Sequence, residues 1–188
     1  MIHYAVPLLG FCAYSGTGKT TLLVQLLPIL KQHGLRIGMV KHAHHSFDID
    51  HPGKDSYELR KAGAEQMLIA SRQRMAFIIE AHEPQPEPVL EEALALLIPQ
   101  QLDLVLVEGF KHAAIPKIEL HRTVLGKPLF YPHDEQVIAI ASDTPLPALP
   151  AALTALDINQ PAQIAAFILH TFLPRQAQLR GLSPGTGP

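Results

Sequence analysis

Residues 6–40 read VPLLGFCAYSGTGKTTLLVQLLPILKQHGLRIGMV, and this stretch decides the fold class. Residues 6–13 are an apolar run typical of a buried strand, and a glycine-rich turn follows them. Residues 20–32 carry leucines along one side, which predicts a helix, and Gly34 is a natural end for it. Residues 35–40 form a second strand-like run. The order strand, loop, helix, strand predicts a βαβ unit.

The rest of the chain continues this alternation. We expect a short helix from residue 55 to about 63 and longer helices over residues 89–98 and 161–172. Expected strands are residues 67–70, 75–80, 102–107, 117–121 (half-exposed, because polar and apolar residues alternate) and 137–141. The pattern predicts an α/β fold: a three-layer phosphate-loop NTPase with a mostly parallel, mixed sheet flanked by helices. We expect one nucleotide-binding domain over residues 1–174 and a disordered tail over residues 175–188, which end in SPGTGP.

Composition excludes several classes of protein. The 188 residues are 47% hydrophobic and carry a net charge of -2, so no basic surface for nucleic acid is expected. Cys12 is the only cysteine, which excludes an internal disulfide and suits a reducing compartment. The apolar run at residues 5–13 is far shorter than the roughly 20 residues that span a bilayer. We therefore expect a cytoplasmic protein without a membrane segment.

The loop at residues 13–20 reads Ala-Tyr-Ser-Gly-Thr-Gly-Lys-Thr and carries the clearest chemistry. It matches the phosphate-loop pattern G-x-x-x-x-G-K-[ST] except that Ala13 replaces the first glycine. Gly16 and Gly18 allow the tight turn that points backbone N–H groups at phosphate. Lys19 is expected to reach the β- and γ-phosphates, and the Thr20 hydroxyl is expected to bind Mg²⁺.

A metal-binding carboxylate is expected after the strand at residues 102–107, where Glu108 and Gly109 follow. Gly109 would let the backbone approach the γ-phosphate. Asp48 and Asp50, in the loop after the second strand, are competing or additional metal ligands, and a reading as solvated loop acids is equally good. We therefore predict Lys19 and Glu108 as catalytic residues. The predicted metal ligands are Thr20, Glu108 and Asp48.

The base-recognition motif Asn-Lys-x-Asp is absent, but Asp143 ends the strand at residues 137–141. One carboxylate can accept both the N1–H and N2–H donors of guanine, so Asp143 is a candidate guanine reader. A turn-forming aspartate before Thr144 and Pro145 explains it equally well. The predicted nucleotide-binding residues are Ser15, Gly16, Thr17, Gly18, Lys19, Thr20, Thr21, Gly109 and Asp143.

Residues 41–51, KHAHHSFDIDH, hold four of the 11 histidines. A transition-metal site is one interpretation, and a polar loop over the nucleotide is the other. No H-E-x-x-H pattern supports zinc, so we favour the polar loop. A third interpretation is that Lys41 or one of the histidines contacts phosphate or a second substrate.

Five segments together resemble the molybdopterin-guanine dinucleotide biosynthesis protein B (MobB) family, over about residues 7–173: SGTGKTTL, KHAHHSFDIDHPGKDSYELRKAGA, ASRQR, LDLVLVEGFKH and IAIASD. The resemblance implies a phosphate-loop GTPase fold, a homodimer, and GTP with Mg²⁺. It implies a protein that assists a separate enzyme, the molybdenum cofactor guanylyltransferase, in attaching GMP to molybdopterin. The assisting protein is expected to have slow GTPase activity of its own. By the same resemblance Gly16, Gly18, Lys19 and Thr20 bind phosphate and metal, and Glu108 is the Walker-B-like acid.

Two other functions stay open at this point. A small-molecule kinase could bind a phosphoryl acceptor near Asp48 and Asp50, and a metallochaperone-type GTPase could use the histidine-rich loop. No water-orienting glutamine or arginine finger is evident in the sequence, so any hydrolysis of GTP is expected to be weak.

Overall fold

The computed structural model describes residues 2–43, 47–81, 83, 86–146 and 149–181. Its contacts divide the chain into two compact units. The first unit comprises Met1–His42 and Leu90–Pro188, and the second comprises Ala43–Val89. None of the helices in the described part of the chain is long and apolar enough to cross a membrane.

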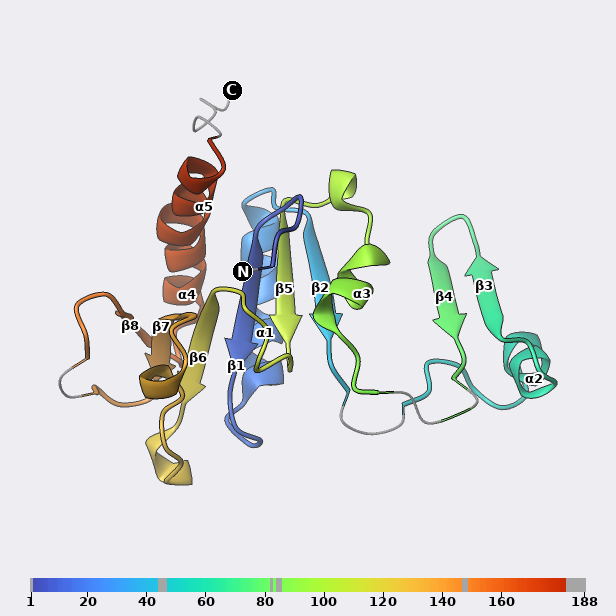
Figure 1. Ribbon diagram of the computed structural model, residues 1–188, viewed down its shortest axis with the longest axis horizontal. Coiled ribbons are helices and arrows are strands. Elements are labelled where there is room, and N and C mark those ends of the chain that lie inside the picture. Colours follow the sequence, from blue (N-terminus) through green and yellow to red (C-terminus); the bar gives the residue numbers. More distant parts are fainter. Residues whose placement is uncertain (1, 44–46, 82, 84–85, 147–148, 182–188) are drawn as a thin grey trace. The chain divides into compact units, whose positions relative to one another are not determined.

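A six-stranded sheet forms the centre of the first unit (Figure 1). Its strands are β1 (Leu8–Cys12), β2 (Ile37–Lys41), β5 (Leu104–Glu108), β6 (Lys117–His121), β7 (Val137–Ser142) and β8 (Thr154–Asp157), in the order β2-β5-β1-β6-β7-β8. Every neighbouring pair is parallel. The carboxyl ends of all six strands therefore meet at one edge of the sheet, where ligands bind in open α/β folds. The short edge strand β8 was not predicted.

Helices cover both faces of this sheet, because each buried strand alternates its side chains between two cores. Leu9 and Phe11 belong to a core with helix α1 (Lys19–Gln32) and helix α4 (Pro161–Phe167). Leu8 belongs to the opposite core, with helix α3 (Leu90–Ala95). Short 3₁₀ turns at Pro99–Gln101, Thr123–Leu125 and Tyr131–His133 complete the connections. The predicted three-layer α/β fold is confirmed.

Strand β6 was predicted to be half-exposed, and that prediction is wrong. Lys117 and Glu119 are 2% and 1% exposed. The Lys117 ammonium lies 2.7 Å from the Asp134 carboxylate, and Glu119 accepts hydrogen bonds from the backbone N–H groups of Phe130 and Tyr131. Polar side chains can be buried where each finds such a partner.

The tail predicted from residue 175 is helical over its first residues. A π-helical turn (Ile168–Phe172) joins α4 to helix α5 (Leu173–Leu179). Pro174 lies in the first turn of α5, directly after the π-helical turn, where the regular hydrogen-bond pattern of the α-helix is already interrupted, so it does not end the helical run. Residues 182–188 lie outside the described residues.

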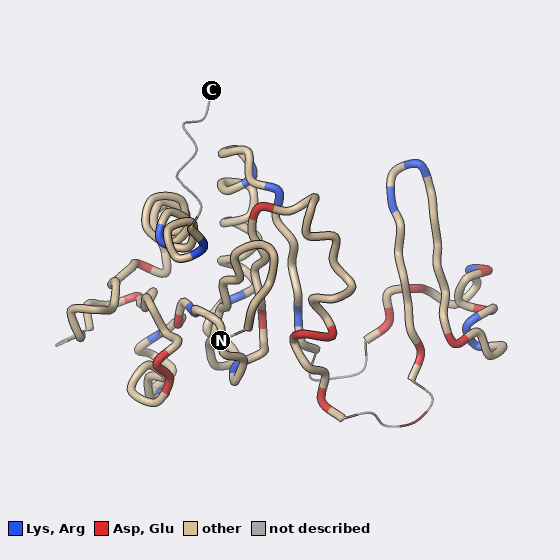
Figure 2. The backbone as a smooth tube through the Cα atoms, turned by 45° about the horizontal axis from the view of Figure 1, so that its top comes forward, with Lys and Arg blue, Asp and Glu red and all other residues tan. Residues whose placement is uncertain are grey.

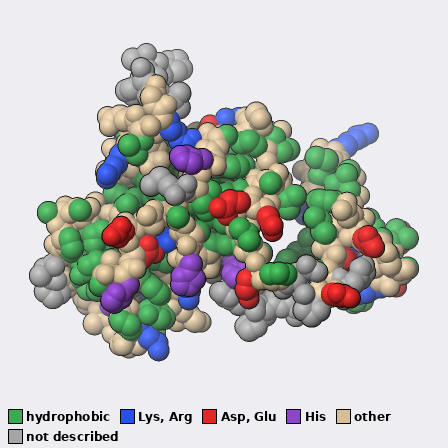
Figure 3. Space-filling model, viewed as in Figure 1, with side chains coloured by type: hydrophobic (Ala, Val, Ile, Leu, Met, Phe, Trp, Pro, Cys, Tyr) green, Lys and Arg blue, Asp and Glu red, His purple; other side chains and the backbone are tan. Residues whose placement is uncertain are grey.

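The second unit contains helix α2 (Asp55–Lys61) and an antiparallel hairpin of β3 (Gln66–Ala70) and β4 (Met75–Ile79). One face of the hairpin carries Leu68, Met75, Phe77 and Ile79, which are all exposed. Figure 3 shows hydrophobic side chains on this hairpin, and Figure 2 shows acidic and basic residues interspersed along the described chain.

Candidate nucleotide-binding site

The predicted phosphate loop connects β1 to α1 and turns where its glycines allow it. Gly16 and Gly18 have φ angles of 82° and 91°, a backbone conformation that other residues rarely adopt. Gly18 directly precedes α1, and its carbonyl accepts the hydrogen bond of Leu22 N–H at 2.9 Å. Thr17 braces the turn, because its hydroxyl donates to the Tyr14 carbonyl at 2.8 Å. The first N–H groups of a helix have no partner within the helix, so the end of this loop is suited to bind an anion.

Ser15, Thr20 and Thr21 are exposed at this loop, whereas Ala13 is buried in the core. Ala13 occupies the position of the missing glycine, and its burial explains why a small residue is needed there. The phosphate loop and the start of α1 therefore hold the predicted phosphate ligands from Ser15 to Thr21 on one continuous segment.

Glu108 lies at the carboxyl end of β5, aligned with Phe11 of β1 and Lys41 of β2. Its carboxylate is 3.5 Å from the Lys19 ammonium and 3.7 Å from the Lys41 ammonium. The structure therefore brings together the two predicted catalytic residues, Lys19 and Glu108, which are 89 positions apart in the chain (108 minus 19). Two cations face one carboxylate here, and the surplus positive charge suits a polyphosphate.

Gly109 has a φ angle of 93°, a backbone conformation in which a larger residue would be strained. A Cβ on Gly109 would lie 3.0 Å from the Cβ and 3.1 Å from the carbonyl oxygen of His42. The His42 N–H group also donates to the Glu108 carbonyl at 2.8 Å. The tight fit thus holds the first histidine of the histidine-rich loop beside the end of β5. An approach of γ-phosphate to Gly109 stays a prediction.

Asp143 follows β7 at the same edge of the sheet. One of its oxygens accepts hydrogen bonds from the Thr123 backbone N–H group at 3.0 Å and from the Thr123 hydroxyl at 3.2 Å. The Thr123 N–H bond is the main reason that the pKa of Asp143 lies below its ordinary value. The second carboxylate oxygen is 3.8 Å from the Arg122 guanidinium.

Arg122 was missed by the sequence analysis, although it connects three parts of the site. Its Nε donates to the carbonyl of Thr17 at 3.0 Å, and its Nη2 donates to the side-chain oxygen of Asn159 at 3.2 Å. With its ion pair to Asp143, the guanidinium joins the phosphate loop to the candidate base reader. The sequence did hold a sign of this role, because Arg122 directly follows the predicted strand at residues 117–121 and residues at that edge of a parallel sheet often bind ligands.

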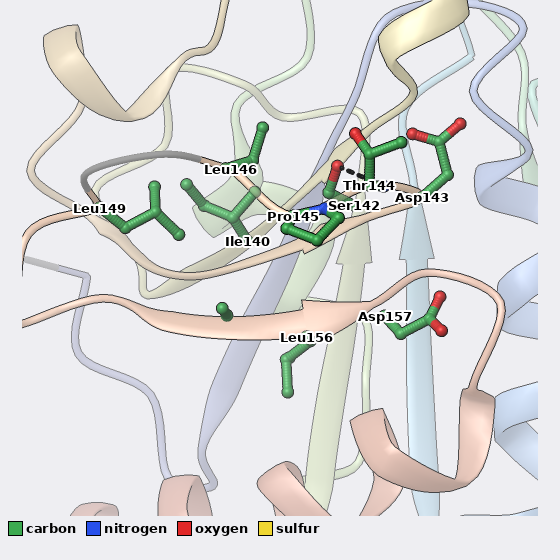
Figure 4. Close-up of a pocket in the computed structure, with 10 residues that line it drawn as sticks. Ile140, Ser142, Asp143, Thr144, Pro145, Leu146, Leu149, Leu156 and Asp157 are labelled. Carbon is green, nitrogen blue, oxygen red and sulfur yellow. Dashed lines mark hydrogen bonds between the residues drawn. The ribbon is translucent and has the colours of Figure 1, made fainter.

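A cavity of 290 Å³ opens beside Asp143 (Figure 4). Ile140, Leu146, Leu149 and Leu156 supply much of its apolar lining, and Ser142, Asp143, Thr144 and Asp157 supply its polar groups. Figure 4 shows Asp143 and Asp157 at one side of the cavity, away from Leu146 and Leu149. An apolar cavity with a few polar groups at one side is typical of a site for a flat, partly polar molecule.

The acidic residues of the second unit have a different partner. The Arg60 guanidinium is buried and lies 2.9 Å from Asp48 and 3.7 Å from Asp50, and Glu80 also pairs with it. The Asp50 N–H group is the first cause of the lowered pKa of Asp48. A metal-binding role for Asp48 stays a prediction, because Asp48 belongs to a separate unit from Glu108.

The histidine-rich loop is only partly described, since His44 and His45 lie outside the described residues. Among the residues that are described, no group of three or more His, Cys, Asp or Glu side chains could hold a metal ion. The metallochaperone interpretation therefore gains no support from the described part of this loop.

A comparison with protein families assigns the chain. Residues 8–143 match the family described as MobB, "Molybdopterin guanine dinucleotide synthesis protein B". The chain belongs to the MobB family. This confirms the family that the sequence resembles.

Individual MobB proteins agree with this assignment. The molybdopterin-guanine dinucleotide biosynthesis adapter protein of Escherichia coli K12 is 50% identical over 165 residues, which cover 87% of this chain and 92% of that protein. The adapter protein of Haemophilus influenzae is 46% identical over 172 residues, covering 89% and 92%. A crystal structure of molybdopterin-guanine biosynthesis protein B covers 88% of this chain and 98% of its own, with a TM-score of 0.67 and 28% identity.

Proposed function

We propose that this MobB protein binds GTP with Mg²⁺ and acts as an adapter in the attachment of GMP to molybdopterin. The observation that carries the nucleotide part is the meeting of Lys19, Lys41 and Glu108 beside the phosphate loop. The relatives' name, molybdopterin-guanine dinucleotide biosynthesis adapter protein, supports the pathway. The proposed location is the cytoplasm.

The residues around Glu108 suit a magnesium nucleotide. Mg²⁺ prefers oxygen ligands, and the Thr20 hydroxyl and the Glu108 carboxylate are oxygen donors of that kind. When bound, Mg²⁺ neutralises charge on the β- and γ-phosphates. Lys19 pairs with Glu108 in the structure, and we expect it to move its ammonium group to the phosphates when the nucleotide enters.

Asp143 is proposed to select guanine. Its ionised carboxylate can accept the N1–H and N2–H donors together, and adenine offers no such pair of donors. The 290 Å³ cavity beside it offers apolar contact for a ring. Arg122 supports this selection by holding Asp143 and the phosphate loop in one network.

Slow hydrolysis fits the charges around the site. Arg122 is engaged with the Thr17 carbonyl, Asn159 and Asp143, on the proposed base side of the phosphate loop. A guanidinium used there is not free to stabilise charge at the γ-phosphate, the contribution that speeds hydrolysis in fast GTPases. A role as adapter to a separate molybdenum cofactor guanylyltransferase therefore suits the site better than rapid turnover of GTP.

The proposed assembly is a homodimer. The exposed apolar face of the β3–β4 hairpin supports it, because a second copy of the chain could cover Leu68, Met75, Phe77 and Ile79.

Calorimetric titration of GTP and ATP, with and without Mg²⁺, tests the nucleotide proposal. We expect Mg²⁺-dependent binding of GTP, and Lys19→Ala should weaken it by about 10- to 100-fold because charged hydrogen bonds to phosphate are lost. Lys31→Ala is the matched control, since Lys31 lies in the last turn of α1. Unchanged GTP affinity in Lys19→Ala would contradict the proposal, and a clear preference for ATP would favour the kinase alternative.

A further inference from the structure

A second cavity of 460 Å³ lies in the first unit, and Tyr14 of the phosphate loop is one of the residues that line it. It is bounded by Tyr14, by residues 111–114 after β5, and by residues 128–136 between β6 and β7. Its volume falls within the range of about 300–1,000 Å³ that is usual for small-molecule sites. Neither the proposed binding of GTP nor the ion pairs of Glu108 use this cavity, which we name the Tyr14–Phe130 cavity.

The wall of the Tyr14–Phe130 cavity has a surplus of positive charge. Lys117 is buried and pairs with Asp134 at 2.7 Å, so these two charges cancel. Lys111 also lines the cavity, and its ammonium has no carboxylate within ion-pair distance among the described residues. His112 and His133 also line the cavity and can donate hydrogen bonds. An anionic ligand is therefore favoured over a neutral or cationic one.

Two aromatic rings form part of the same wall. The Tyr14 and Phe130 rings are stacked, with centroids 4.5 Å apart and an interplanar angle of 18°. The Lys111 ammonium lies 5.9 Å from both ring centroids. A flat ligand ring can extend this stack, while an anionic group of the ligand bonds to Lys111.

We propose that the Tyr14–Phe130 cavity binds a phosphomonoester of a planar heteroaromatic compound. The phosphate would bond to Lys111, and the ring would pack against Tyr14 and Phe130. The ring is a pterin if the proposed function holds, because molybdopterin, the compound that receives GMP, contains a pterin. Since Tyr14 belongs to the phosphate loop, the acceptor and the nucleotide would contact two sides of one loop.

Fluorescence titration with 6-hydroxymethylpterin monophosphate tests this proposal. We expect saturable binding to the full chain, weakened at least about tenfold in Lys111→Ala because a charged hydrogen bond is lost. Phe130→Leu keeps an apolar side chain but removes the flat ring, and should also weaken binding. Lys31→Ala is the matched control and should bind as the unchanged chain does. The unphosphorylated pterin should bind more weakly, and its affinity should not depend on Lys111.

Two results would overturn the proposal: no saturable binding to the unchanged chain, or equal affinity in Lys111→Ala and in the unchanged chain. GTP titrations of the same samples separate this proposal from the nucleotide proposal. Lys111→Ala should keep its GTP affinity, and Lys19→Ala should keep its pterin affinity. Thermal unfolding of Phe130→Leu shows whether that variant is folded, and Lys111→Ala carries the test if it is not.

Discussion

Asp143 lies directly after β7, at the edge of the sheet where the six parallel strands end. Asp143 could be read from the sequence either as a guanine reader or as a turn former. The structure shows the carboxylate accepting hydrogen bonds from Thr123, which lies 20 positions earlier in the chain, and pairing with Arg122, which reaches the phosphate loop. This contact between distant segments and a binding role are compatible, because only part of the carboxylate's bonding capacity is used.

Replacement of Asp143 tests base selection at this scale. Asp143→Ala should weaken GTP binding by about 10-fold or more and leave ATP binding unchanged, because two hydrogen bonds to a charged group are lost only with guanine. Calorimetric titration of both nucleotides measures this. Asp157→Ala is the matched control, since Asp157 lines the same cavity. Loss of the GTP preference in Asp157→Ala alone would move base selection to Asp157.

Strand β6 shows how an element can depart from its sequence pattern. Alternating polar and apolar residues predict a half-exposed strand, but the structure surrounds β6 with β1 and β7. Glu119 is buried there with two backbone N–H groups as partners. Burial also raises the pKa of Glu119 above its ordinary value of 4.5, because the charged form loses water.

The raised pKa of Glu119 predicts a pH dependence of stability. The folded chain holds this proton more tightly than the unfolded chain, so the contribution of Glu119 to the free energy of unfolding is fully present below about pH 4.5 and is lost as the pH rises through the folded pKa. Urea unfolding at several pH values measures this. Glu119→Gln should lower stability by about 1–3 kcal/mol, since one buried N–H group loses its acceptor, and should remove this part of the pH dependence.

Asp103 serves as a control because its pKa is shifted in the opposite direction to that of Glu119. Its hydrogen bond from Arg36 lowers its pKa, so its contribution to stability is lost as the pH falls through that lowered pKa. Asp103→Asn should therefore alter the acid side of the stability profile. An identical pH profile for Glu119→Gln and the unchanged chain would contradict the role assigned to Glu119.

At the scale of the whole molecule, the chain divides into two units with unequal cores. The first unit has buried residues on both faces of a six-stranded sheet. The second has a two-stranded hairpin, and such hairpins are only marginally stable by themselves. Arg60 and its acidic partners Asp48, Asp50 and Glu80 hold α2, the loop before it and the end of β4 together. The apolar face of the hairpin is exposed in the single chain.

The proposed homodimer can be tested on that face. The double substitution Leu68→Asp and Phe77→Asp should shift the protein from dimer to monomer, because two desolvated charges oppose burial of the face. Sedimentation velocity at several protein concentrations measures the change. Val24→Asp, at an exposed apolar position of α1, is the control and should leave the dimer intact. A dimer that survives the hairpin substitutions would place the contact elsewhere.

Much of the fold was predictable because its signals are local. The apolar runs at residues 6–13 and 137–141 and the pattern before Gly34 mark strands and a helix whose positions the structure confirms. The edge strand Thr154–Asp157 was not predictable, since four residues that pair with one neighbour carry little pattern of their own. The pairing of buried Lys117 with Asp134 was also hidden, because a charge pattern does not reveal its partner in space.

The order of the residues was sufficient to predict the family, and to mark a glycine-rich turn between a strand and a helix and a carboxylate after an apolar strand, because these are local patterns. The binding roles of that turn and of Glu108 stay predictions. Packing was needed for the rest. Arg122 reaches Thr17 across 105 positions of the chain, and the Tyr14 ring, after β1, stacks on the Phe130 ring, between β6 and β7. Such contacts depend on which strands lie side by side, and the β2-β5-β1-β6-β7-β8 order pairs strands from distant parts of the sequence, so it is a property of the folded chain as a whole.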